Sequence, residues 1–238
     1  MTEPLFRADA YLRDATATVV GLTAEGGIIV DRSLFYPTSG GQPGDSGRLE
    51  WQGGGIDIAV AVKGEGQTIV LVPSEPAPLP PVGQAVEQKI NWDRRYRHMR
   101  VHTALHLLSV VVPLPVTGGS ISTEKGRLDF DMPEAPADKQ QIEDALNALI
   151  AADYTVSESY ISDAELDAQP NLVKTMSVKP PRGTGQIRMV RIGDADASID
   201  WQPCGGTHVR STAEIGPIRI GKIEKKGAQN RRINVILD

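Results

Sequence analysis

Cysteine and histidine are scarce in this chain of 238 residues, which has one cysteine and four histidines. A single cysteine excludes a disulfide within the chain, so nothing favours an oxidising compartment. No hydrophobic run approaches the roughly 18 residues of a membrane span. The N-terminus, MTEPLFRADAYLRD, lacks the basic and apolar regions of a signal peptide. These absences predict a cytoplasmic protein without a membrane partner.

The few cysteine and histidine side chains are not scattered. HTALH carries His102 and His106 four residues apart, and CGGTH carries Cys204 and His208 at the same spacing. Residues four apart on a helix share a face, so both imidazoles can reach one ion. The glycines of CGGTH allow a tight loop to supply the other two ligands. The pattern predicts a Zn²⁺ site formed by His102, His106, Cys204 and His208.

Two other interpretations of these residues compete with zinc binding. The helical pair can be a core feature with Cys204 as a small buried residue, as free cysteines often are, but that leaves a complete ligand set unexplained. A metalloprotease needs a glutamate directly after the first histidine to act as the general base. Thr103 occupies that position, which excludes the protease.

Charge is unevenly distributed along the chain. The net charge is −5, which argues against a nucleic-acid partner, yet residues 171–238 contain twelve Lys and Arg against six Asp and Glu. Four arginines (Arg94, Arg95, Arg97 and Arg100) also open the histidine helix. Solvated surface is one explanation, but local basic patches suffice for phosphate binding. His98, one helical turn before His102, is predicted to be a surface or linker residue.

Short β-branched runs between glycine clusters dominate the first 90 residues and predict a small β-barrel. The proline-rich segment 72–81 is expected to be an exposed loop that joins the last two strands. Residues 1–91 are therefore predicted to form one domain. The expected strands are 17–21, 27–31, 56–62, 68–72 and 85–90.

The remaining residues, 92–238, mix strands and helices without regular alternation, which predicts an α+β domain. Asp93 is the expected N-cap of a helix that runs to about Val112. Further helices are expected at 137–153 and 162–168. The expected strands are 116–122, 126–132, 155–161, 186–192, 216–222 and 231–237, and 180–185 is expected to be a loop.

Four motifs in this order are specific to one family. They are FYP..GGQPGD.G from Phe35, RRYRHMRVHTALHLL, TGGSI...GRLDFDM, and CGGTHV.STAEIGPIRI.K.EKKG...RRI. The chain from Phe35 to Leu237 thereby resembles the alanyl-tRNA editing proteins. These are free-standing relatives of the editing domain of alanyl-tRNA synthetase and are similar to that of threonyl-tRNA synthetase. The glycine-rich motif matches the medium-length form.

The resemblance implies a β-barrel followed by a zinc-containing editing domain, without an aminoacylation domain. It implies the same four zinc ligands, an ATP-independent deacylase activity, and tRNA(Ala) carrying a wrong amino acid as the partner. The chain departs from the family at Leu105, where a polar residue is common, and at Thr117, where glutamine is frequent. The expected catalytic or substrate contacts are Thr117, Ser120, Gln42, Gly40, Gly41, Thr103 and Thr207. The expected tRNA contacts are Arg94, Arg95, Arg182, Lys225 and Lys226.

An amino-acid binding site for alanine cannot fully exclude glycine or serine, because a difference of one methylene or hydroxyl changes the binding free energy by only about 1–3 kcal/mol. A second, hydrolytic site must therefore remove serine or glycine from tRNA(Ala). Zinc either activates water or positions the substrate, and the sequence favours positioning because four protein ligands close the coordination shell. A thiol hydrolase using Cys204 and His208, and a zinc-stabilised RNA-binding module, remain alternatives. A monomer is expected.

Overall fold

The computed structural model describes residues 1–136, 138–176 and 185–238. The chain divides into two compact units, Met1–Tyr96 and Arg97–Asp238. Helix α2 (Trp92–Val111) begins in the first unit and continues into the second. Among the described residues, no helix is both long and apolar enough to cross a membrane.

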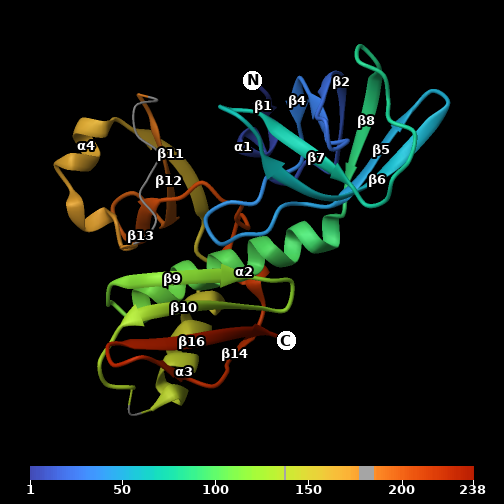
Figure 1. Ribbon diagram of the computed structural model, residues 1–238. Helices are drawn as coiled ribbons and strands as arrows, with labels where there is room; N and C mark the ends of the chain where they lie inside the picture. The colour runs from blue at the N-terminus through green and yellow to red at the C-terminus, as the bar shows by residue number, and fades with distance from the viewer. Residues whose placement is uncertain (137, 177–184) are drawn as a thin grey trace. The chain divides into compact units, whose positions relative to one another are not determined.

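The first unit is a closed antiparallel barrel of six strands, which confirms the predicted barrel (Figure 1). Its interior holds the alternate apolar residues of these strands, together with Leu34, Phe35 and Tyr36 from the segment after β4. In order around the barrel the strands are β2 (Asp14–Leu22), β3 (Ile28–Val30), β7 (Ile69–Pro73), β6 (Gly54–Lys63), β5 (Gly47–Trp51) and β8 (Ala85–Ile90). Beside it, β1 (Glu3–Pro4) pairs in parallel with β4 (Arg32–Ser33), and α1 spans Leu5–Ala8.

The barrel differs from the prediction at β5, which the sequence pattern missed. This strand follows the glycine-rich motif directly, and Leu49 is its one fully buried side chain, so it has little hydrophobic signal. The proline-rich segment joins β7 to β8, as predicted. Buried Gln88 on β8 accepts a hydrogen bond from Leu34 N (3.0 Å) and donates one to Arg32 O (3.1 Å). Its amide thereby fixes the chain segment that leads into the glycine-rich motif.

That motif begins with a two-residue hairpin turn. Ser39 and Gln42 exchange both backbone hydrogen bonds (3.0 and 2.9 Å). Gly40 and Gly41 between them have φ values of 56° and 84°. A two-residue turn with positive φ at both central positions strongly prefers glycine, so the Gly-Gly pair is explained by backbone geometry.

The second unit contains two antiparallel sheets. One has the order β14–β16–β10–β9, with β15 also paired to β16, and the other has the order β11–β12–β13. The strands of the first are β9 (Val116–Ile121), β10 (Lys125–Asp131), β14 (Ile218–Ile220), β15 (Glu224–Lys226) and β16 (Asn230–Leu237), and those of the second are β11 (Val156–Ile161), β12 (Ile187–Gly193) and β13 (Ser198–Pro203). This mixture confirms the predicted α+β class.

Helices cover the larger sheet. Figure 1 shows α3 (Lys139–Ala151) behind it, with Ile142, Leu146 and Ile150 buried. The side chain of Asn147 pairs with both backbone groups of Ile218 on the edge strand β14 (2.9 and 3.0 Å). Short helices complete the unit: α4 (Asp163–Asp167), η1 (Pro170–Leu172) and η2 (Thr212–Ile215).

Helix ends lie close to the predicted ones, with one correction. The N-cap of α2 is Asn91, whose side chain accepts from Arg94 N at 3.1 Å, so the helix starts before Asp93. Asp138 caps α3 by accepting from Gln140 N, and Ser162 forms a capping box with Glu165 at α4. The predicted start of α3 at Ala137, and most of the loop predicted at 180–185, lie outside the described residues.

Candidate metal centre

Helix α2 carries the first two candidate ligands. Val101, Leu105 and Leu108 are buried and share one side of the helix, and Met99 is also buried. His102 is half-buried and His106 is 6% exposed. Their rings lie 5.2 Å apart between centroids, so both imidazoles occupy one region beside the helix.

Strand β13 delivers the other two candidate ligands. It ends at Pro203, and Cys204 N still donates to Arg188 O of β12 (3.1 Å). The Arg188 guanidinium then binds the next turn, because its Nη1 donates to Cys204 O (2.6 Å) and Gly206 O (2.9 Å). Glu158 of β11 fixes the other edge of the guanidinium (Nε to Oε2, 2.8 Å). The CGGTH loop is thus tied to the sheet, with Cys204 and His208 directed to the same place.

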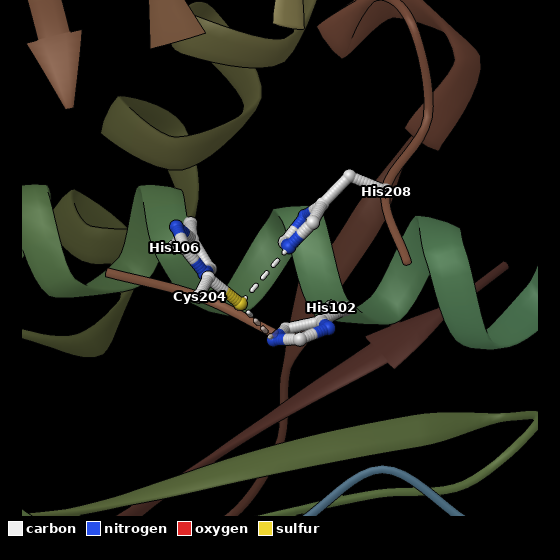
Figure 2. A group of neighbouring side chains, drawn as sticks. All are labelled: His102, His106, Cys204 and His208. Atoms are coloured by element: carbon white, nitrogen blue, oxygen red, sulfur yellow. Dashed lines mark hydrogen bonds between the residues drawn. The ribbon is translucent and has the colours of Figure 1, made fainter. Parts of the chain in front are cut away.

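The four side chains converge in a single cluster (Figure 2). One ligand atom from each of His102, His106, Cys204 and His208 lies within 4.8 Å of the other three. Cys204 Sγ lies 3.5 Å from His102 Nε2 and 3.3 Å from His208 Nε2. A tetrahedral zinc ion with ordinary Zn–S and Zn–N bonds separates S and N ligands by about 3.6 Å. The donor set and its spacing therefore fit zinc.

Hydrogen bonds behind the cluster orient two of the imidazoles. Asp200 Oδ2 lies 2.9 Å from His106 Nδ1, and a carboxylate can only accept, so that nitrogen carries the proton. Thr103 donates its hydroxyl to Met99 O (3.0 Å), and its oxygen lies 3.1 Å from His208 Nδ1. The Nδ1 atom of His208 is therefore also the protonated one. Both rings keep the Nε2 lone pair for a metal ion.

Electrostatics favour the metal-binding form of the thiol. Burial raises the pKa of Cys204, but its interactions with the neighbouring histidines, above all His102, outweigh burial and hold that pKa well below its usual value. Burial, together with the charge of His102, lowers the pKa of His208 well below its usual value. Thiolate and neutral imidazole are the forms that bind metal. A cluster of this kind attracts a soft cation.

The candidate ligand His106 is hydrogen-bonded to an acidic partner, Asp200. Burial lowers the pKa of His106, but hydrogen bonds to Asp200 and Cys204 outweigh it and raise that pKa. Burial opposes ionisation of Asp200, but His106 and Lys174 outweigh it and lower its pKa. Asp200 is therefore a carboxylate behind the imidazole, and a bound cation competes with the second proton of His106.

The structure places the predicted substrate residues in three different settings. Thr103 is a fully buried residue of α2 whose side chain faces His208. Thr207 is buried within the CGGTH loop. Thr117 and Ser120 lie on β9, where Thr117 Oγ1 is 3.1 Å from Asp129 O and 3.2 Å from Asn230 Oδ1. The residues predicted from the glycine-rich motif, Gly40, Gly41 and Gln42, belong to the barrel unit, where Gln42 is buried.

The predicted tRNA contacts include one clear correction. Arg95 is 0% exposed, and its guanidinium binds Asp45 together with the backbone oxygens of Ala10 and Leu34. It is a structural residue of the barrel unit and offers tRNA no surface. Lys225 and Lys226 are exposed, Arg94 is half-buried, and Arg182 lies outside the described residues. His98 is also buried, contrary to its predicted surface position.

Four residues around the cluster escaped the sequence analysis: Lys174, Arg188, Asp200 and Gln202. Three of them appeared only as members of a charge count. The alternation of β13 contains the missing signal, because Asp200, Gln202 and Cys204 lie two residues apart and so share one face of the strand. Recognising that alternation requires β13 to be identified as a strand first, and it was not among the predicted strands.

Comparison with known proteins agrees with this geometry. Residues 187–234, which include Cys204 and His208, match the family described as the threonyl and alanyl tRNA synthetase second additional domain. Residues 11–94 match the family of class II (A) tRNA synthetases.

Curated relatives match almost the whole chain. The alanyl-tRNA editing protein AlaX-M of Methanosarcina acetivorans is 34% identical, with 98% of each chain covered. AlaX-M of Saccharolobus solfataricus is also 34% identical, again with 98% of each chain covered. The alanine–tRNA ligase of Pyrobaculum aerophilum is 35% identical over 94% of this chain but only 25% of the ligase. As its motifs predicted, this chain belongs to the alanyl-tRNA editing protein family.

Proposed function

We propose that this protein hydrolyses the ester bond between tRNA(Ala) and a wrongly attached amino acid, with serine the main substrate and glycine a second one. The observation that carries the proposal is the convergence of His102, His106, Cys204 and His208 in a chain of which 98% is matched by proteins named for alanyl-tRNA editing. In the reaction, water adds to the ester carbonyl and the ribose oxygen of the terminal adenosine leaves with a proton.

Zinc is the metal that this ligand set fits best. Three imidazole nitrogens and one thiolate form a mixed N and S set, whereas Mg²⁺ and Ca²⁺ require oxygen ligands. When bound, zinc supplies a Lewis acid that polarises or orients oxygen and nitrogen groups of a substrate. The four protein ligands favour a positioning role.

The protein's own residues would hold the reacting groups around that site. Arg188 keeps the CGGTH loop against β12 through the carbonyls of Cys204 and Gly206, which supports a role in holding the two ligands of that loop in place. We assign recognition of the seryl hydroxyl to Thr117 and Ser120, the two hydroxyl side chains of β9. The substrate role expected for Gly40, Gly41 and Gln42 stays a prediction from the sequence, since these residues belong to the barrel unit. Exposed Lys225 and Lys226 are assigned to the tRNA phosphates.

The direct test is deacylation of a panel of tRNAs. Ser-tRNA(Ala) and Gly-tRNA(Ala) should lose their amino acid, and correctly charged Ala-tRNA(Ala) is the control. His102→Ala and Cys204→Ala should lose both bound zinc and activity. His98→Gln is the matched variant, since it removes the imidazole of the same helix that lies outside the cluster, and it should keep both.

The outcomes separate the proposal from its alternatives. Absence of hydrolysis of every tRNA, at enzyme concentrations well above substrate, would contradict editing and leave a zinc-stabilised RNA-binding module. Hydrolysis by a protein free of zinc, abolished by Cys204→Ala, would instead favour a thiol hydrolase that uses Cys204 and His208. About one zinc per chain, lost together with activity in Cys204→Ala, supports the metal-dependent editing reaction.

A further inference from the structure

Asp200 is a buried carboxylate with three polar partners. It is 3% exposed, and its Oδ2 lies 2.9 Å from His106 Nδ1 and accepts from Gln202 Nε2 at 2.8 Å. Its Oδ1 accepts from Lys174 Nζ at 2.6 Å. A buried carboxylate is costly unless it is paired and hydrogen-bonded. Asp200 meets both conditions, and one of its hydrogen-bond partners is the candidate metal ligand His106.

These contacts join three separate parts of the second unit. His106 lies on α2, and Asp200 and Gln202 lie on β13 of the three-stranded sheet. Lys174 belongs to a segment tied to the larger sheet, since its carbonyl accepts from Val116 N of β9 at 3.0 Å. The carboxylate is therefore fixed in position by elements on more than one side, and the imidazole it meets cannot turn without breaking a hydrogen bond to a charged group.

The contacts also determine which face of the imidazole is offered to the cluster. Asp200 can only accept, so Nδ1 of His106 carries hydrogen and Nε2 keeps its lone pair. Gln202 Nε2 lies 3.1 Å from the same Nδ1, but as a donor it bonds to Asp200 rather than to the protonated ring nitrogen. Gln202 thus holds the carboxylate edge that meets the ring.

We propose that Asp200 is a positioning residue that orients His106 as a metal ligand, and that Lys174 acts on the metal through Asp200. The proposal rests on the proposed function only in that the cluster binds a metal ion. Asp200 is not one of the four candidate ligands. A carboxylate behind a ligating histidine fixes its tautomer and increases its basicity, and loss of such a partner typically costs roughly 10–100-fold in metal affinity.

The experiment measures zinc affinity of the full-length protein by competition with a chromophoric chelator. Asp200→Asn should weaken zinc binding by roughly 10–100-fold. The matched control is Asp129→Asn, which also removes a carboxylate paired with a cation in this unit (Arg232 Nε to Oδ1, 2.7 Å) but is not bonded to a ligand. It should leave zinc affinity within about twofold of the parent. Replacing zinc by Co²⁺ gives a second measurement, because its visible absorption bands change when a histidine ligand is displaced.

A double-variant cycle tests the role of Lys174. If the lysine acts through Asp200, Lys174→Met should change zinc affinity in the parent but not in Asp200→Asn. Equal zinc affinity and unchanged cobalt bands in Asp200→Asn would overturn the proposal, as would an equal loss in Asp129→Asn. Additive effects of the Lys174 and Asp200 substitutions would overturn the part assigned to Lys174.

Both readouts are independent of tRNA. If Asp200→Asn weakens zinc binding while the parent hydrolyses no aminoacyl-tRNA, the proposed function fails and the positioning role stands. If the parent hydrolyses Ser-tRNA(Ala) and Asp200→Asn retains full zinc affinity, the positioning role fails and the proposed function stands.

Discussion

The guanidinium of Arg95 and the carboxylate of Asp45 form an ion pair in which both side chains are completely buried. Arg95 Nε lies 2.9 Å from Asp45 Oδ2 and 3.0 Å from Oδ1. Asp45 Oδ2 also accepts from Tyr36 N at 2.6 Å. Asp45, the aspartate of the GGQPGD motif, therefore joins the end of the motif to Tyr36 near its beginning and to Arg95 at the start of α2, all within the barrel unit.

Breaking this pair should be among the most destabilising single changes in the barrel unit. Asp45→Asn leaves the Arg95 charge buried without its counterion, and removal of one partner of a buried ion pair costs about 3–5 kcal/mol. Urea unfolding followed by circular dichroism and tryptophan fluorescence measures the loss. The control is Asp57→Asn, which removes the exposed partner of Arg48 (2.8 Å); solvent screens such pairs, and its effect should be far smaller. Equal losses in the two variants would contradict the structural role of Asp45.

A close approach between Gly126 of β10 and α2 should limit substitution in the second unit. A Cβ atom at Gly126 would lie 2.5 Å from Val101 Cγ1 and 3.0 Å from Leu105 Cδ1. Both neighbours are buried and β10 is hydrogen-bonded on both sides, so relief requires these packed side chains or the helix that carries them to shift. Gly126→Ala is expected to destabilise the protein by about 1–3 kcal/mol, measured from the thermal and urea midpoints.

Gly118 on the neighbouring strand provides the matched substitution for Gly126. A Cβ there meets Asp129 Oδ2 at 3.6 Å, an ordinary contact. Gly118→Ala should leave stability unchanged or raise it slightly, because alanine reduces the freedom of the unfolded chain. If both alanine variants unfold at the same midpoint as the parent, β10 and α2 are not packed as closely as the structure has them.

Arg188 should be irreplaceable by lysine. Its planar fork reaches two loop carbonyls and Glu158 at once, whereas a lysine ammonium cannot reproduce that geometry. Arg188→Lys is therefore expected to loosen the CGGTH loop and to weaken zinc binding by roughly tenfold. Hydrogen exchange at the amides of residues 205–207 should rise in parallel.

Arg191→Lys is the comparison for Arg188, since Arg191 lies on the same strand with its guanidinium over the Trp201 ring at 4.5 Å. Residues three apart on a strand point to opposite faces, so this substitution should leave zinc affinity and loop exchange unchanged. A comparable loss in both variants would indicate that any change in β12 disturbs the loop.

The sequence predicted those helices and strands in which apolar residues recur at regular spacing. The alternation of Val86, Gln88 and Ile90 identified β8, and the spacing of Ile142, Leu146 and Ile150 identified α3. The strands that escaped are short or polar: β5 has one fully buried residue, and β13 carries Asp200 and Gln202 at buried positions. One buried polar residue, as at Gln88, leaves apolar neighbours to mark a strand, but successive buried positions that are both polar, as at Asp200 and Gln202, remove the alternation that identifies it.

The same distinction applies to the site. The four candidate ligands were predictable because each pair has a local spacing that brings both side chains to one ion. Arg95 and Lys174 were not, since a positive charge in the sequence gives no indication of burial. The partner of Arg95 is 50 residues away and that of Lys174 is 26 residues away. Such pairings depend on the tertiary fold, which determines whether a charged residue is structural or available to a nucleic acid.

Asp129 should make stability depend on pH in the acidic range. Burial raises the pKa of its carboxyl, but hydrogen bonds from Arg232 (2.7 and 2.9 Å) and Arg127 (2.6 Å) outweigh burial and lower it. A carboxyl with a lower pKa in the folded than in the unfolded protein adds stability above its unfolded pKa of about 3.9. That contribution is lost as the pH falls through the folded pKa.

Asp129→Asn should therefore be less stable than the parent at pH 7, and the difference should shrink progressively below about pH 4. Urea unfolding of both proteins, from about pH 3 to about pH 7, measures this difference in the free energy of unfolding. A difference that stays constant across that range would mean that the two arginines do not hold the ionised form of Asp129 in the folded protein.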